Sequence, residues 1–140
     1  TPRLVIEFYN LSSPDEILAV PGLFAIGLDA DGLEVPIYNE IVTTRSSITL
    51  PLKTNDVITE FKLYKSYDVV DGVVSGNPDT IKITYEAEDV YVSRACGYKT
   101  IFDIQTFAIT SDSDQWMIGS DILIREITNE NDIHVKILHL

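Results

Sequence analysis

Apolar and polar residues alternate along most of the chain, beginning with residues 4–9. There, Leu4, Ile6 and Phe8 share one side of the backbone, and their neighbours share the other. A period of two is typical of β-strands with one buried and one solvated face. By the same alternation we predict further strands at residues 23–28, 33–38, 47–52, 60–67, 80–86, 90–94, 100–109, 122–127 and 133–138.

One segment, residues 14–20, favours a helix instead. Ser13 could cap it, Pro14 suits the first helical position, and the two acidic residues that follow suit the positive end of a helix. A Pro-Gly pair at 21–22 would end it after about two turns. We therefore expect at most one short helix, near residues 14–20.

Several Asp-Gly and Asn-rich segments mark turns between the strands. Asp31-Gly32 predicts a tight hairpin, because glycine adopts a positive φ without steric cost. Asp71-Gly72 and residues 75–79 predict a longer loop, and a closing hairpin is expected around residues 128–132. About 8–10 short, evenly spaced strands favour an antiparallel β-sandwich. With no repeat or linker, residues 1–140 are expected to form a single all-β domain.

The charge of the chain narrows the classes of partner. Its formal net charge is −12, which disfavours binding to nucleic acids and to anionic lipid head groups. No apolar run approaches the roughly 20 residues of a membrane-spanning helix. The chain begins at Thr1-Pro2 directly ahead of a predicted strand. We therefore expect further residues upstream, with a targeting segment among them.

One loop combines an indole with nearby carboxylates, namely Trp116 with Asp112, Asp114 and Asp121. Calcium takes several carboxylate and carbonyl oxygens from flexible loops, so these residues are a candidate cation site. An exposed Trp116 could stack on a sugar or anchor a protein partner. The alternatives are a solvated loop, whose Asp and Ser residues favour turns, and a Trp that covers the core as a lid.

The sequence shows no catalytic constellation. Its carboxylates alternate with apolar residues, so they project from strand faces and do not converge. His134 and His139 are an odd number of residues apart, which places them on opposite faces of a strand. Cys96 has neither a neighbouring histidine nor a nucleophile motif. We therefore expect no enzymatic activity, no cofactor and no metal.

Four segments carry a resemblance to a known family: "TPRLVIEFYN", "ITLPLKTND", "TYEAEDVYVSRACGYKTIFD" and "NENDIHVKIL". Together they resemble an uncharacterised family of small cell-envelope lipoproteins of the Bacteroidota, a domain of unknown function. The likeness covers nearly the whole chain, and residues 91–99 are its most specific part. Members have a lipoprotein signal, an acylated cysteine and a second cysteine just before the Thr-Pro. This chain has neither cysteine, which we attribute to a segment upstream.

The resemblance implies a partner for the single thiol. Cys96 would form a disulfide with an upstream cysteine, which would add about 2–4 kcal/mol in an oxidising compartment. The alternative is a buried free thiol that serves as a small apolar residue. The resemblance also implies a periplasmic location and an upstream lipid anchor in the outer membrane.

Two functions remain as expectations. The first is a non-enzymatic protein that binds a periplasmic or outer-membrane complex, such as an accessory or plug-like subunit of the type nine secretion translocon. Unpaired strand edges and acidic faces would suit such binding. The second is a carbohydrate- or Ca²⁺-binding β-sandwich module that uses Trp116 and its acidic loop.

Overall fold

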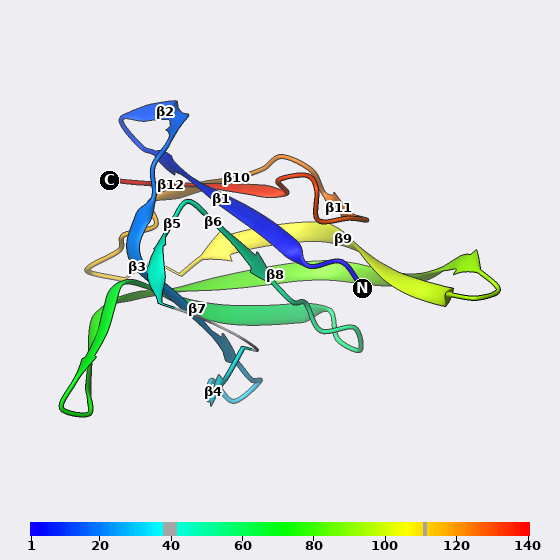
Figure 1. The fold of residues 1–140 in the computed structure, drawn as a ribbon, viewed down its shortest axis with the longest axis horizontal. Helices are drawn as coiled ribbons and strands as arrows, with labels where there is room; N and C mark the ends of the chain where they lie inside the picture. Colours follow the sequence, from blue (N-terminus) through cyan, green and yellow to red (C-terminus); the bar gives the residue numbers. More distant parts are fainter. Residues whose placement is uncertain (38–41, 111) are drawn as a thin grey trace.

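The structure, a computed structural model, describes residues 1–37, 42–110 and 112–140. These residues form strands and connections without a helix, so the all-β prediction is confirmed (Figure 1). The strands belong to two sheets that enclose one core, which gives a β-sandwich-like fold. The predicted strand at 33–38 is reduced to a short β4, and Tyr38 lies outside the described residues.

The smaller sheet is built around the first strand. Its members are β1 (Leu4–Asn10), β2 (Ser13–Ile17), β6 (Ser47–Leu50), β10 (Gly119–Ile122) and β12 (Val135–His139). Strand β1 pairs with β12 on one side and with β2 and β6 on the other. The β1–β12 pair is parallel, so the expectation of a wholly antiparallel sandwich is wrong for this pair. A parallel pair needs a connection longer than a hairpin, and here most of the chain supplies it.

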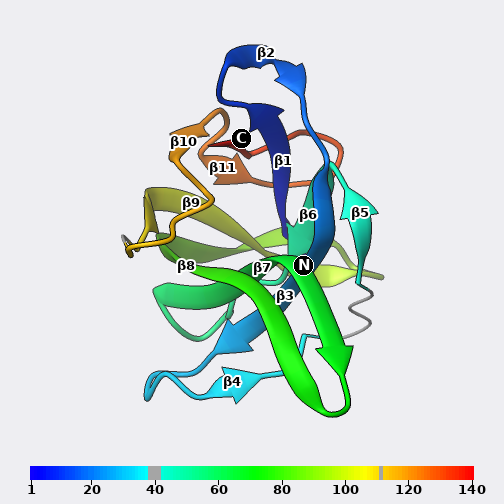
Figure 2. The ribbon, with the colours of Figure 1, turned by 90° about the vertical axis from the view of Figure 1, so that its left-hand side faces the viewer.

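The larger sheet curls into an antiparallel half-barrel, with β5 paired at its edge to β3. Its members are β3 (Val20–Leu28), β4 (Glu34–Val35), β5 (Thr43–Arg45), β7 (Ile58–Val70), β8 (Val73–Ser93), β9 (Gly97–Ile109) and β11 (Glu126–Ile127). Strand β8 is 21 residues long and joins two of the predicted strands into one. Its hairpins with β7 and β9 extend beyond the sandwich at opposite ends (Figures 1 and 2).

The expected short helix near residues 14–20 does not form, because residues 13–17 are strand β2. The chain turns back at Leu11-Ser12, where the Asn10 side chain accepts a hydrogen bond from the Ser12 amide at 2.9 Å. Tyr9 then pairs with Ile17 across the hairpin. An isolated helix of two turns is marginal in water, and proline is tolerated in an edge strand such as β2.

Three turn predictions have different outcomes. The Asp31-Gly32 turn is confirmed, since β3 and β4 pair antiparallel on either side of it. The loop predicted over residues 71–79 is wrong, because Asp71-Gly72 alone forms the turn and residues 75–79 belong to β8. The closing hairpin is also wrong. Ile122 ends β10, which pairs with β12, whereas Ile127 in β11 pairs with β9 in the other sheet.

The core lies between the two sheets and follows the alternation of the sequence. Leu4, Ile6 and Phe8 of β1 are fully buried, as the pattern predicts. They meet residues that alternate along the larger sheet: Leu23, Ala25, Phe61, Leu63, Ile81, Ile83, Phe102 and Ile104. Trp116 and Met117 join this cluster from the segment that connects the sheets. Each buried side chain of this size contributes about 1.5–3 kcal/mol.

Candidate functional site

The end of the β8–β9 hairpin, residues 90–99, carries the single cysteine and is called here the tyrosine end. Ser93 pairs with Gly97, and residues 94–96 form the turn. The Cys96 amide donates to the Ser93 hydroxyl at 3.0 Å, and Gly97 has a φ of 67°. The Cys96 thiol is free in this chain and exposed, so its interpretation as a buried apolar residue is wrong.

Two aromatic rings cover one side of the tyrosine end. Tyr91 and Tyr98 are cross-strand partners with ring centroids 5.6 Å apart and planes at 73°. They are 59% and 70% exposed, and the neighbouring Val92 is 48% exposed. Edge-to-face pairs of this kind favour a fixed arrangement of the rings. The hairpin therefore presents an ordered aromatic surface beside a thiol.

Trp116 is 5% exposed, so its indole offers no face to a sugar. Its Nε1 donates to the Leu63 carbonyl at 3.2 Å, and its ring stacks on Phe8 with centroids 6.0 Å apart. The bond to Leu63 and the stack on Phe8 fix the segment after β9 across the edge of the core. The sequence left two interpretations of Trp116 open, an exposed binding residue and a lid over the core. In the structure Trp116 is the lid.

The acidic residues of the same loop do not converge as a set. Asp112 accepts a hydrogen bond from the Asp114 amide at 2.8 Å, which is the local turn that Asp residues favour. Asp121 lies in β10 opposite Lys136 of β12. No group of three or more potential metal-ligating side chains is found within residues 1–37, 42–110 and 112–140.

A residue that the sequence did not single out, Asp79, is the polar centre of this region. It is 1% exposed, and its Oδ2 accepts hydrogen bonds from the Trp116 and Met117 amides at 2.7 and 2.8 Å. Its Oδ1 is buried without a hydrogen-bond partner among the described residues. Burial raises the pKa of the carboxyl, and the neighbouring Asp112 carboxylate raises it further. No local signal could have identified Asp79, because its partners are 37 and 38 residues away.

A row of like charges crosses three strands of the larger sheet. Glu86 of β8 is opposite Asp103 of β9, which is opposite Glu126 of β11. Together with Glu88 they line a depression of about 400 Å³. Like charges directly opposite one another destabilise a sheet. The row is a strongly negative surface on β8, β9 and β11, and the β8–β9 hairpin continues from it to Tyr91 and Tyr98.

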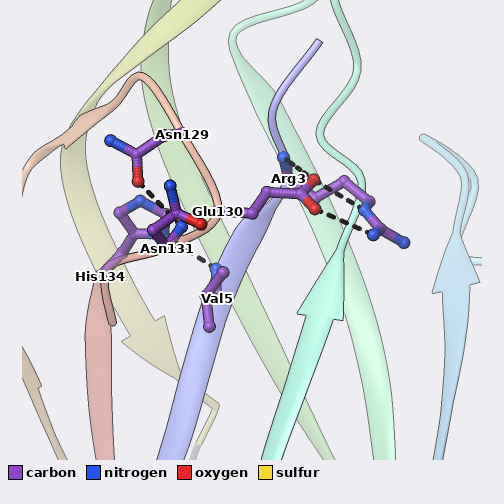
Figure 3. A network of polar contacts seen from close by, with 6 residues as sticks. All are labelled: Arg3, Val5, Asn129, Glu130, Asn131 and His134. Carbon is purple, nitrogen blue, oxygen red and sulfur yellow. Dashed lines mark hydrogen bonds and ion pairs between the residues drawn. The ribbon is translucent and has the colours of Figure 1, made fainter.

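A polar network joins the start of β1 to the turn before β12 (Figure 3). The Arg3 guanidinium donates to both carboxylate oxygens of Glu130, at 2.8 and 3.0 Å, and lowers the pKa of Glu130 to about 2. The Val5 amide donates to His134 Nδ1 at 2.9 Å. Because burial lowers the pKa of His134, its ring is a neutral acceptor that supports the parallel β1–β12 pair.

The other histidine is held in a separate place. His139 is 1% exposed, and its Nε2 is 2.8 Å from the Leu18 carbonyl. It lies edge-on to Phe8 and Trp116, with ring centroids 6.0 and 5.8 Å away. His134 and His139 therefore have different partners, and each has a structural role in packing.

Four valines form a second exposed surface, at the end of the β7–β8 hairpin. This end, residues 66–77, is called here the valine end, and its exposed apolar residues are Val69, Val70, Val73 and Val74. The sequence contained the signal for it, because four valines flank an Asp-Gly pair whose residues both favour a two-residue hairpin turn.

Within the described residues no helix is long and apolar enough to cross a membrane.

Comparisons with known proteins match the chain to a family. A model of a family of unknown function, DUF6452, matches residues 23–139. No curated protein and no solved structure matches the chain significantly. Since the match covers most of the chain, from within β3 to the end of β12 and with both hairpin ends, the protein belongs to the DUF6452 family of unknown function.

Proposed function

We propose that this protein acts by binding another protein and that the tyrosine end is a contact surface. The observation that carries this proposal is the ordered pair of rings, Tyr91 and Tyr98, which are 59% and 70% exposed. Tyrosine is enriched among residues that dominate binding energies, because it combines a large apolar body with a hydroxyl group. Rings that are already ordered lose little conformational entropy when they bind.

The acidic row gives the partner its expected charge. Glu86, Glu88 and Asp103 lie further along the same hairpin, and Glu126 lies beside them in β11. The whole chain has a net charge of −12. Complementary charges speed association and exclude wrong partners. A basic surface on the partner protein is therefore the best match, and nucleic acid is disfavoured.

The proposed location is the periplasm, with a tether to the outer membrane through a lipid anchor upstream. Within it, the protein would be an accessory or plug-like subunit of an outer-membrane complex, such as the type nine secretion translocon. The support is the resemblance to envelope lipoproteins, whose most specific part, residues 91–99, coincides with the tyrosine end. The function is non-enzymatic in this proposal.

Co-purification from native membranes tests the contact surface. We expect wild-type protein to recover an envelope protein in stoichiometric amount, and a Tyr91→Ser/Tyr98→Ser variant to recover at least about tenfold less. A Leu33→Ser variant is the matched control, because Leu33 is 64% exposed and lies in the turn between β3 and β4. The proposal would be contradicted if the wild-type protein were recovered without a partner. It would also be contradicted if the double variant recovered as much partner as the wild type.

The disulfide of Cys96 with an upstream cysteine belongs to the same proposal. The exposed thiol at the hairpin end can be reached from outside the domain. Non-reducing peptide mass mapping of the protein from native cells should find Cys96 oxidised. A thiol that is readily alkylated in that protein would show that the tyrosine end is not tied to an upstream segment.

Calcium binding is a second candidate, favoured by the buried Oδ1 of Asp79 beside the Asp112 carboxylate. A cation between the two carboxylates would supply the missing partner. A ligand that binds only the folded state raises the melting temperature. The melting temperature should therefore rise in millimolar CaCl₂ for the wild type and not for Asp112→Asn. An unchanged melting temperature in the wild type eliminates this candidate.

A further inference from the structure

The valine end is a two-stranded ribbon that leaves the larger sheet. Strand β3 pairs with β7 only as far as Tyr64, and β9 pairs with β8 only from Ile81. Between these limits, residues 68–70 of β7 pair with residues 73–75 of β8. In the described residues, neither segment pairs with β3 or β9. The ribbon bends away from the sandwich at the side opposite the tyrosine end (Figures 1 and 2).

The bend is fixed by the backbone and by packing at its base. A register shift lies between Lys65 and Asp68, where Ser66 has a φ of 56° and Gly76 a φ of 118°. A Cβ atom on Gly76 would lie 2.9 Å from the Ser66 carbonyl oxygen, so only glycine fits the corner. Tyr67 also stacks on Phe24 with ring centroids 4.2 Å apart. The ribbon is therefore held at a set angle.

The exposed valines occupy both faces of this ribbon. Val69 pairs with Val74 and Val70 with Val73, and neighbouring pairs point to opposite faces. Their exposed fractions lie between 50% and 67%. A partner that covered only one face of the ribbon would leave the two valines of the other face in water. Burial of all four requires an occupant that surrounds the end of the ribbon.

The charges at the valine end decide what that occupant is. Asp71 lies at its turn and Asp68 beside the valines, and both are exposed. If the ribbon entered a membrane turn first, the Asp71 carboxylate would have to be moved into lipid hydrocarbon, which is costly. The net charge of −12 makes the chain repel anionic membranes and other copies of itself. A cleft in another protein can provide both apolar walls and a cation.

We infer that the valine end inserts into an apolar cleft of a partner protein, with a Lys or Arg side chain of the partner at the cleft floor facing Asp71. The apolar walls would cover Val69 and Val74 on one side and Val70 and Val73 on the other. Burial of four half-exposed valines supplies affinity, and the cation fixes the depth of insertion. This contact is separate from that of the tyrosine end.

Photocrosslinking in native cells tests the insertion. With Val73 replaced by p-benzoylphenylalanine, irradiation should give an adduct with one protein, mapped to apolar residues close to a Lys or Arg. In the protein that carries the photoreactive residue, the added substitutions Val69→Thr and Val74→Thr should lower the adduct yield by about tenfold. Threonine keeps the shape and strand preference of valine, but its hydroxyl makes burial against an apolar wall less favourable. Asp71→Asn should also lower it, and Asp71→Lys should lower it further.

Val57→Thr is the matched control, because Val57 is 55% exposed and lies outside the valine end. It should leave the yield unchanged. The inference is overturned by an adduct with phospholipid or with a second copy of the chain, by no adduct, or by a yield that Val69→Thr/Val74→Thr leaves intact. It is also overturned by flotation of the purified protein with phosphatidylcholine or phosphatidylglycerol vesicles. A photoreactive residue at Tyr98 reports on the tyrosine end independently.

Discussion

The two ends of β8 belong to one strand but reach their shapes by different means. At the valine end, the backbone determines the direction, through the bulge at Ser66 and the glycine opposite it. At the tyrosine end, the side chains of Tyr91 and Tyr98 pair across the hairpin, and a Cβ added to Gly97, directly after the turn, would meet nothing within 4 Å. A change of backbone should therefore matter most at the valine end, and a change of side chain should matter most for binding at the tyrosine end.

The largest effect is expected from Gly76→Ala. Alanine would adopt an unfavourable φ and place its Cβ against two carbonyl oxygens, at 2.9 and 3.0 Å. Strain of this kind should lower the free energy of unfolding by about 3 kcal/mol, measured by urea denaturation. Gly97→Ala is the control, since its φ of 67° is strained but nothing lies within 4 Å of the added Cβ. It should cost about 1 kcal/mol. Equal costs would show that the corner at Gly76 is not fixed by packing.

The sequence predicted the strands wherever one face is buried. In β1, Leu4, Ile6 and Phe8 are fully buried and Glu7 and Tyr9 are partly solvated, so the period of two is visible although Val5 is also buried. It failed at residues 75–79, where Ser, Gly, Asn and Pro are typical of a loop. There Gly76 serves a bulge, and residues 75–78 are exposed or half-buried, so neither composition nor period reveals a strand.

The candidate sites were predictable to different degrees. The Tyr91–Tyr98 pair could have been found by extending the strand predicted from residue 100 back toward the Cys96 turn and pairing it with the strand predicted at 90–94. The position of Asp79 could not, because it depends on a loop that crosses from one sheet to the other. The parallel β1–β12 pair could not be predicted either. It joins residues at opposite ends of the chain, and the alternation of apolar and polar residues within each strand does not show which strands pair.

The second prediction concerns Asp79, close to the base of the valine end. Because its pKa is raised in the folded protein, the folded state holds this proton more tightly than the unfolded state. Stability from this group is therefore present below the ordinary Asp pKa of about 4 and is lost as pH rises through the raised value. Asp79→Asn removes this titration and should be about 1 kcal/mol more stable than the wild type at pH 7.

Urea denaturation of both proteins between pH 4 and 7 measures this effect. The stability of the wild type relative to Asp79→Asn should fall as pH rises. Glu130, with its pKa of about 2, titrates in both proteins, so its contribution cancels in the difference. A difference that is constant with pH would mean that the buried carboxyl is not protonated more readily in the folded state.

The smallest effects are expected for the exposed side chains at the two ends. Tyr98→Ser removes one half of an exposed ring pair and should lower the free energy of unfolding by about 0.5–1 kcal/mol. Val70→Thr should change it by less than about 0.5 kcal/mol, since Val70 is 58% exposed. Urea denaturation measures both. Because these costs are far below that of Gly76→Ala, any loss of partner binding in the same variants would come from the surface itself. A cost for Val70→Thr near 3 kcal/mol would instead show that the valine side chains support the fold, so that the valine end too depends on its side chains.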